Sequence, residues 1–327
     1  MPADPIHADW IISCSSLLRL IIFIACEQME KSGMDDEPTE EGLCEVQRDA
    51  FSENPPVVME VSQRQYPRRW KLPLLLFIAT CASTYFTGGA AFAFSLLTIL
   101  LAHEFGHFLQ AKRYGVPATY PCFIPMPLSP IGTMGAVIAM QPGRGDRRSI
   151  FDIAISGPIA GFFPALAFSV YGLMQSTIIE VTEASSRLSL GEPLIFKFMV
   201  YLIFGEMPEG TDVLLHPVAF AGWVGIFITA LNLFPIGQLD GGHILYTLLL
   251  KRSRTISKGL LLAAVVGVIY FGYWGWTLML LLLFAMGPEH PKTANDDVPL
   301  GGVRIALGWM ALLFMPFGFT PMPFALQ

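Results

Sequence analysis

Charged residues are scarce in this chain of 327 residues. Asp, Glu, Lys and Arg make up 14% of it, whereas hydrophobic residues make up 53%. A soluble globular chain has about 25% charged residues, so this composition excludes an ordinary soluble domain and indicates a membrane protein. The formal net charge of −6 says little about partners, because the acidic residues cluster near the N-terminus. No nucleic acid is expected among the partners.

Cysteine pairs are also missing. The five cysteines are Cys14, Cys26, Cys44, Cys81 and Cys122, and no two of them form a CxxC motif. An odd number without metal-ligand spacing argues against a disulfide scaffold and against a cysteine zinc cage. We therefore expect unpaired thiols.

Residues 1–70 contain no recognisable secretory signal. The apolar run 10–26 is short, and acidic rather than basic residues precede it. Residues 27–62 are acidic, which predicts a largely disordered tail; an over-called start codon, with Met29 or Met34 as the real beginning, is equally consistent. We divide the chain into this tail, residues 1–70, and a transmembrane domain, residues 71–320.

Long apolar runs fill the transmembrane domain. At roughly 20 residues per crossing, the fold class is an all-α polytopic membrane protein with about six transmembrane helices. The expected spans are residues 72–86, 90–110, 153–174, 217–250, 259–286 and 303–319. The fourth span is broken near 232–240, whereas 259–286 is expected to cross once. A β-favouring run at 132–139 predicts a short membrane-associated hairpin between spans two and three.

Basic residues set the expected topology. Their clusters at 64–71, 112–148 and 251–258 fall beside span ends that can share one side. The positive-inside rule then predicts cytoplasmic N- and C-termini, with the connections 175–213 and 287–302 on the opposite side. A multi-pass protein of a bacterial plasma membrane is the default expectation, with a plastid membrane as the alternative.

Residues 103–107 read His-Glu-Phe-Gly-His inside an apolar span. An ionisable side chain at mid-membrane depth costs roughly 2.5–3.5 kcal/mol on insertion scales, so such residues usually have a function. On a helix, His103 and His107 share one face and can bind Zn²⁺, which leaves Glu104 free to act as a general base. The alternative is a packing histidine pair, which the apolar context disfavours.

Two histidines leave a catalytic zinc site at least one protein ligand short. The fourth span offers Asp240, beside a break at Pro235 and Gly237 that is tolerated only where protein or a water-filled cavity covers the freed backbone. At 1.5 Å per helical residue, the three candidates lie within roughly 8–16 Å of the basic ends of their spans. One alternative is that Asp240 only caps the N-terminus of a helix. Another concerns His243, one turn further on, which could bind the metal itself or hydrogen-bond a residue that does.

The two motifs together resemble the site-2 protease family of intramembrane zinc metalloproteases. They are His-Glu-x-x-His in one span and Asn-x-x-Pro followed by Leu-Asp-Gly in a later one. The resemblance covers roughly residues 70–287 and implies a zinc metalloendopeptidase. It is to a compact form, because the segment 175–213 is too short for an inserted PDZ domain and no CBS pair follows the last span.

The resemblance implies that His103, His107 and Asp240 bind Zn²⁺. Glu104 would remove a proton from the attacking water and later protonate the leaving amine.

It also implies a substrate-binding strand and a polar partner for the reacting carbonyl. Asn232 would hydrogen-bond the peptide carbonyl or the tetrahedral intermediate, although it could instead only satisfy backbone freed by Pro235. Gly132, Gly135 and Val137 belong to a strand that would pair with a locally unwound substrate helix, since a helical peptide bond hides its carbonyl.

The expected activity is hydrolysis of peptide bonds in or near the span of a single-span membrane protein within the bilayer. Such a substrate could be an anti-sigma factor or another membrane-tethered regulator cut in regulated intramembrane proteolysis. A metal transporter is the first alternative, but the polar residues gather at one depth instead of following a path. A pseudoprotease scaffold is the second, and the intact Glu104 counts against it. Residues 156–161, Ser-Gly-Pro-Ile-Ala-Gly, indicate close helix packing.

Overall fold

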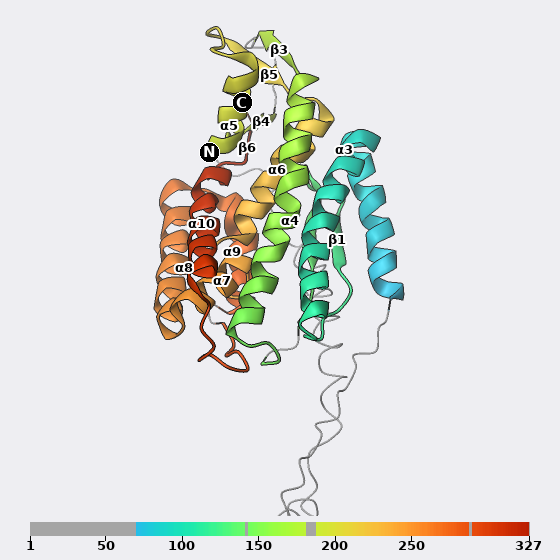
Figure 1. Cartoon of the computed structure of the whole chain (residues 1–327). Helices are drawn as coiled ribbons and strands as arrows, with labels where there is room; N and C mark the ends of the chain where they lie inside the picture. Colours follow the sequence, from blue (N-terminus) through green and yellow to red (C-terminus); the bar gives the residue numbers. More distant parts are fainter. Residues whose placement is uncertain (1–69, 141–142, 181–187, 288–289, 327) are drawn as a thin grey trace, which may run out of the picture. The chain divides into compact units, whose positions relative to one another are not determined.

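The structure is a computed structural model that describes residues 70–140, 143–180, 188–287 and 290–326 (Figure 1). The predicted tail, residues 1–70, lies outside the described residues except for Trp70. The described part is mainly helical, as predicted. Three of its helices are long and apolar enough to cross a membrane: α3 (Lys71–Arg113), α4 (Arg147–Met174) and α8 (Lys251–Phe271). The count of six spans is not confirmed, because the remaining apolar helices are shorter.

Helix α3 consists of two halves joined at Gly89. The backbone there is non-helical, with φ 77° and ψ −179°, a conformation that glycine adopts without the steric clash of a Cβ. In Figure 1 the chain runs up the blue half of α3 and returns down the teal half. The turn predicted at 87–89 is therefore confirmed, and the second half contains residues 103–107.

Helix α6 (Pro217–Asn232) packs against both α3 and α4 and forms the centre of the core. Trp223 and Ile226 of α6 are fully buried together with Phe92 and Leu96 of α3. The predicted break follows directly, since α6 ends at Asn232 and α7 (Asp240–Leu249) begins at Asp240.

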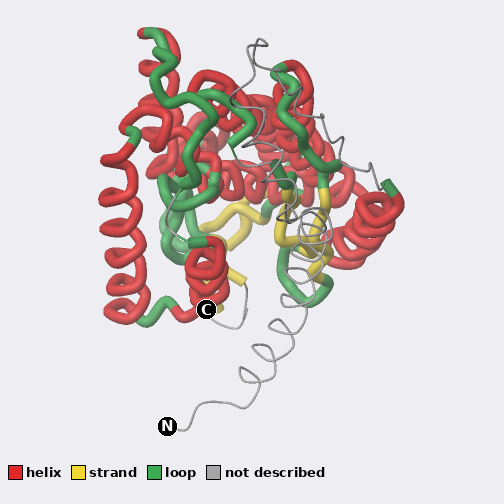
Figure 2. Tube along the Cα trace, turned by 90° about the horizontal axis from the view of Figure 1, so that it is seen from below, coloured by secondary structure: helices red, strands yellow, loops and turns green. Residues whose placement is uncertain are grey.

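Short strand pairs connect or extend the helices. The predicted hairpin between α3 and α4 is confirmed: β1 (Cys122–Met126) pairs antiparallel with β2 (Gly132–Val137). Two further antiparallel pairs were not predicted. They are β3 (Thr177–Glu180) with β5 (Thr211–Leu214), and β4 (Leu188–Leu190) with β6 (Phe324–Leu326). Figure 2 shows these strands as short yellow pieces among the red helices. Helix α5 (Leu194–Phe204) lies between β4 and β5 in the chain.

The prediction that residues 259–286 cross once as a single helix is wrong. Helix α8 ends at Phe271. Gly272, which follows, has a left-handed backbone with φ 70°, and the turn η1 (Trp274–Trp276) leads into α9 (Thr277–Met286). Leu261 of α8 and Leu283 of α9 belong to one buried cluster. The two helices therefore pack side by side, and the chain reverses its direction between them.

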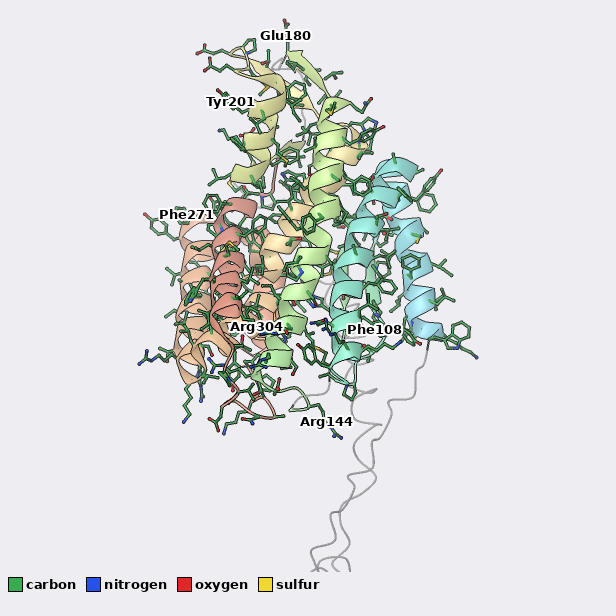
Figure 3. All side chains as sticks on the ribbon, in the orientation of Figure 1. Phe108, Arg144, Glu180, Tyr201, Phe271 and Arg304 are labelled. Atoms are coloured by element: carbon green, nitrogen blue, oxygen red, sulfur yellow. The ribbon has the colours of Figure 1, made fainter. Side chains whose placement is uncertain are left out.

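Because of this reversal, the segments after α9 lie on the side of the membrane opposite to the predicted one. The amide of Ala294 donates to the carbonyl of Gly145, 2.8 Å away, so the segment after α9 lies beside the basic residues around Arg147 rather than opposite them. Helix α10 (Gly302–Gly318) then runs back, and β6 pairs with β4. The C-terminal strand therefore lies on the side of the connection 175–213, and the prediction that it shares the side of the basic segments is wrong. In Figure 3, Arg144 and Glu180 mark these opposite ends.

Candidate metal centre

The second half of α3 positions three polar side chains in the interior. His103, Glu104 and His107 are 3%, 5% and 8% exposed. Because residues four apart lie on one face of a helix, both imidazoles point toward the start of α7. Burial of three ionisable side chains requires partners among the neighbouring helices.

The joint between α6 and α7 supplies a carboxylate. A Cβ on Gly241 would lie 2.0 Å from the carbonyl oxygen of Leu233, and one on Gly242 would lie 2.3 Å from that of Gly237. Only glycine at these two positions lets the first turn of α7 fold tightly against the loop that precedes it. This close contact keeps Asp240 beside the end of α6 and near Asn232.

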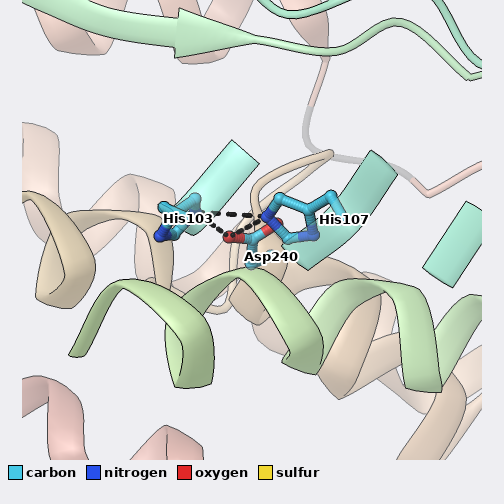
Figure 4. Close-up of side chains that lie close together, drawn as sticks. All are labelled: His103, His107 and Asp240. Atoms are coloured by element: carbon cyan, nitrogen blue, oxygen red, sulfur yellow. Dashed lines mark hydrogen bonds and ion pairs between the residues drawn. The ribbon is translucent and has the colours of Figure 1, made fainter. Parts of the chain in front are cut away.

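His103, His107 and Asp240 converge on one point (Figure 4). Nε2 of His103 lies 3.1 Å from Nε2 of His107 and 3.2 Å from Oδ2 of Asp240, and Nε2 of His107 lies 3.3 Å from the same oxygen. A tetrahedral Zn²⁺ with ligand bonds of about 2.0–2.1 Å separates its ligand atoms by about 3.3–3.4 Å. Two imidazole nitrogens and a carboxylate oxygen at these separations therefore fit a catalytic zinc site.

Hydrogen bonds hold the ring of His107 in place. Its Nδ1 lies 2.8 Å from the carbonyl oxygen of Ile153 in α4. A carbonyl only accepts, so Nδ1 is the protonated nitrogen and Nε2 keeps its lone pair for a metal.

Asn232 reaches the same cluster. Its Nδ2 lies 3.2 Å from Nε2 of His103. The amide of Asn232 therefore lies at the edge of the metal centre and is not limited to satisfying backbone near Pro235.

His243 does not join the three converging side chains. Its Nδ1 pairs with Nε2 of His290, whose ring stacks on that of Tyr246 with ring centroids 4.2 Å apart. Burial lowers the pKa of His290 to about 3, so its imidazole is neutral. The contact links α7 to the segment that follows α9.

The predicted substrate strand lies next to α3. The hydroxyl of Ser83, in the first half of α3, donates to the carbonyl of Gly132 over 2.6 Å, and a Cβ on Gly132 would lie 2.8 Å from Oγ1 of Thr87. Further along β2, Gly135 is buried and has a φ of 94°, whereas Val137 is exposed. The structure thus brings the start of β2 against the first half of α3.

The neighbouring strand, β1, lies within electrostatic reach of Glu104. Burial raises the pKa of the Cys122 thiol in β1, and the carboxylate of Glu104 raises it further. Cys81 and Cys122, the two cysteines in the described part of the chain, are both unpaired, as predicted.

Two charged residues near the centre escaped the sequence analysis. Asp152, which precedes Ile153 in α4, forms an ion pair with Arg304 of α10. Both lie at the edges of predicted spans: Asp152 directly precedes the span 153–174, four residues after Arg148, and Arg304 is the second residue of the span 303–319. A charge at the end of a span is ordinary, so neither residue is conspicuous in the sequence.

Comparison with known proteins places this site in a family. Residues 91–271, more than half of the chain, match the model of peptidase family M50. No solved structure matches significantly.

The chain is also similar to plant proteins named as probable chloroplastic zinc metalloproteases. It is 36% identical to EGY1 of Oryza sativa subsp. japonica over 47% of this chain and 27% of that protein. It is 30% identical to EGY1 of Arabidopsis thaliana over 70% of this chain and 42% of that protein, and 29% identical to EGY2 of the same plant over 68% and 41%. The chain thus spans less than half the length of these relatives.

These relatives correct one expectation and confirm another. Their names place them in the chloroplast, so the default of a bacterial plasma membrane is not supported. The resemblance to site-2 proteases, in contrast, rests on the region that the family model matches: the chain belongs to peptidase family M50.

Proposed function

We propose that this chain is an intramembrane zinc metalloprotease that hydrolyses peptide bonds in or near the transmembrane segment of a membrane protein. The observation that supports the proposal best is the meeting of His103, His107 and Asp240, whose donor atoms all lie within 4.8 Å of one another. Their buried position beside Glu104 adds the general base that hydrolysis needs.

His103, His107 and Asp240 would hold Zn²⁺ through Nε2, Nε2 and Oδ2. Bound zinc supplies Lewis-acid chemistry, which polarises a carbonyl and lowers the pKa of water. Glu104 removes a proton from the attacking water and passes it to the leaving amine. With Glu104 only 5% exposed, bulk water is kept from the proton while it is transferred.

Asn232 would stabilise the negative charge that develops on the carbonyl oxygen. Its Nδ2 lies 3.2 Å from Nε2 of His103. When the lone pair of that nitrogen binds metal, the amide N–H is free to donate to a substrate oxygen. An oxyanion donor of this kind lowers the barrier only if it is already positioned.

The substrate would enter as an extended segment. A helical peptide bond is shielded by its own hydrogen-bond ladder, whereas an extended one can pair with a strand. Gly132, Gly135 and Val137 of β2 would provide that strand, and Ser83 fixes its first residue to α3. The hairpin follows directly after the helix that contains Glu104.

We infer a single-span membrane protein as substrate, such as a membrane-tethered regulator cut in regulated intramembrane proteolysis. The bilayer is the expected environment, given three helices able to cross it. The chloroplastic location in the names of the relatives favours the plastid membrane over the bacterial one.

Replacement of the general base tests this function. We expect Glu104→Gln, in the full chain reconstituted in lipid, to lower the cleavage of a single-span reporter by about 10²–10⁴-fold while zinc content stays unchanged. Glu192→Gln is the matched control, because Glu192 is exposed and pairs with Lys197 at 3.4 Å. Undiminished cleavage by Glu104→Gln would contradict the assignment.

A further inference from the structure

Helix α4 contributes no metal-binding side chain, yet it lies in contact with both histidines. A Cβ on Gly157 would lie 2.0 Å from Nε2 of His107, and one on Gly161 would lie 2.9 Å from Cβ of His103. Real Cβ atoms essentially never approach other atoms below 3.0 Å. The side chains of the two histidines therefore occupy the space that side chains at these positions would fill.

The same face of α4 binds the far side of the His107 ring. Residues 153, 157 and 161 are spaced four apart and share one face of the helix. The carbonyl of Ile153 accepts from Nδ1 of His107 over 2.8 Å and from the hydroxyl of Ser156 over 2.7 Å.

Helix α3 makes the complementary adjustment. A Cβ on Gly106 would lie 2.5 Å from the carbonyl oxygen of Ser156. Glycine on both helices thus lets their backbones approach, as small residues do between membrane helices. Gly106 directly precedes His107, so this close approach lies next to a residue that would bind metal.

We propose that Gly157 and Gly161 are positioning residues of the metal centre. They allow the Ile153 carbonyl to reach Nδ1 of His107, which fixes the imidazole as the tautomer with Nε2 free, and they seat the ring of His103. The inference rests on the proposed ligand set of His103, His107 and Asp240. It assigns to residues 156–161 a role in metal binding beyond helix packing.

Helix α4 offers a matched control in Gly172. A Cβ there would lie 2.1 Å from the backbone nitrogen of Ala219 in α6, so Gly172→Ala is as crowded as Gly157→Ala. Gly172 lies near the C-terminal end of α4, about four turns away from Gly157. Both variants replace glycine by alanine within the same helix. A difference in zinc affinity between the two variants therefore reflects what each glycine contacts and not the substitution itself.

The experiment measures the zinc dissociation constant of the full chain by chelator competition, together with the unfolding midpoint of the apo protein. We expect Gly157→Ala to raise the dissociation constant by about 10–100-fold and Gly161→Ala to raise it less. Gly172→Ala should lower the midpoint and leave zinc affinity unchanged. Equal zinc affinities for Gly157→Ala and Gly172→Ala would overturn the proposal.

A spectroscopic measurement on the unmodified chain covers the case in which Gly157→Ala does not fold. Imidazole ¹⁵N shifts of the zinc-loaded protein should show His107 protonated at Nδ1 and metal-bound at Nε2. A metal-bound Nδ1 overturns the proposal. Failure of the proposed function is distinguishable, because it would appear as zinc content that His103→Ala and Asp240→Ala do not change.

Discussion

Arg304 of α10 and Asp152 of α4 form a two-pronged ion pair. Nε of Arg304 donates to Oδ1 of Asp152 over 2.7 Å, and Nη2 donates to Oδ2 over 2.8 Å. The hydroxyl of Tyr114, at the end of α3, donates to the same carboxylate. One side chain of α4 thus connects α3 and α10, next to the residue whose carbonyl holds His107.

Neutralising this carboxylate should loosen the helices around the centre. We expect Asp152→Asn to lower the free energy of unfolding by about 1–3 kcal/mol, because a bidentate hydrogen bond to a charged and mostly buried group is lost. Denaturant unfolding of the detergent-solubilised chain measures this value. Lys197→Ala is the control, since its partner Glu192 is exposed and surface pairs contribute only about 0–1 kcal/mol. A loss no larger than in the control would show that the ion pair does not clamp the helices.

Asp240 and His243 differ in their contact with the centre, and zinc affinity should reflect it. Asp240→Ala removes one of three donors and should raise the zinc dissociation constant by more than the roughly 10–100-fold typical of an outer hydrogen-bond partner. His243→Ala should change it by less than about 10-fold, because His243 pairs with His290 instead. The opposite order would move the third ligand to His243.

The role of Asn232 can be decided by measuring both kcat and zinc affinity of one variant. Removal of a single oxyanion donor typically costs about 10²–10³ in kcat, so Asn232→Ala should show that loss with nearly unchanged zinc affinity. Reporter cleavage and zinc competition on one preparation provide both values. If zinc affinity falls and kcat per zinc-loaded protein does not, Asn232 supports His103 and not the reacting carbonyl.

The reversal at Gly272 predicts where the C-terminus lies. A reporter fused after Gln327 should be accessible from the side opposite to a tag placed beside Arg144, because β6 pairs with β4. A tag near Lys292 should share the side of Arg144, since neighbouring Ala294 bonds to Gly145. Labelling of sealed vesicles from each side measures this. C-terminal and Arg144 tags on the same side would contradict the strand pairing.

The polar motifs were predictable because an ionisable side chain in an apolar run is costly to insert into a membrane and is therefore usually functional. His103 and Asp240 stand out in this way, and helical rise alone put them at a similar depth. Their meeting, however, depends on tertiary contacts such as those of Gly241 and Gly242, which the sequence shows only as helix-breaking residues.

The errors come from segments whose composition fits two structures. Residues 259–286 are apolar and uncharged throughout, and their length suits one crossing as well as a short hairpin. The choice depends on the left-handed backbone of Gly272 and on the packing of Leu261 against Leu283. Neither is visible in hydropathy.

The depth of His107 has a consequence for what a cut would release. His107 precedes Arg113, the last residue of α3, by six positions, or roughly 9 Å of helix. A peptide cut at this depth leaves only a short apolar segment on the product that faces the side of the basic residues. That product could dissolve into the aqueous compartment, whereas the longer remnant would stay anchored in lipid.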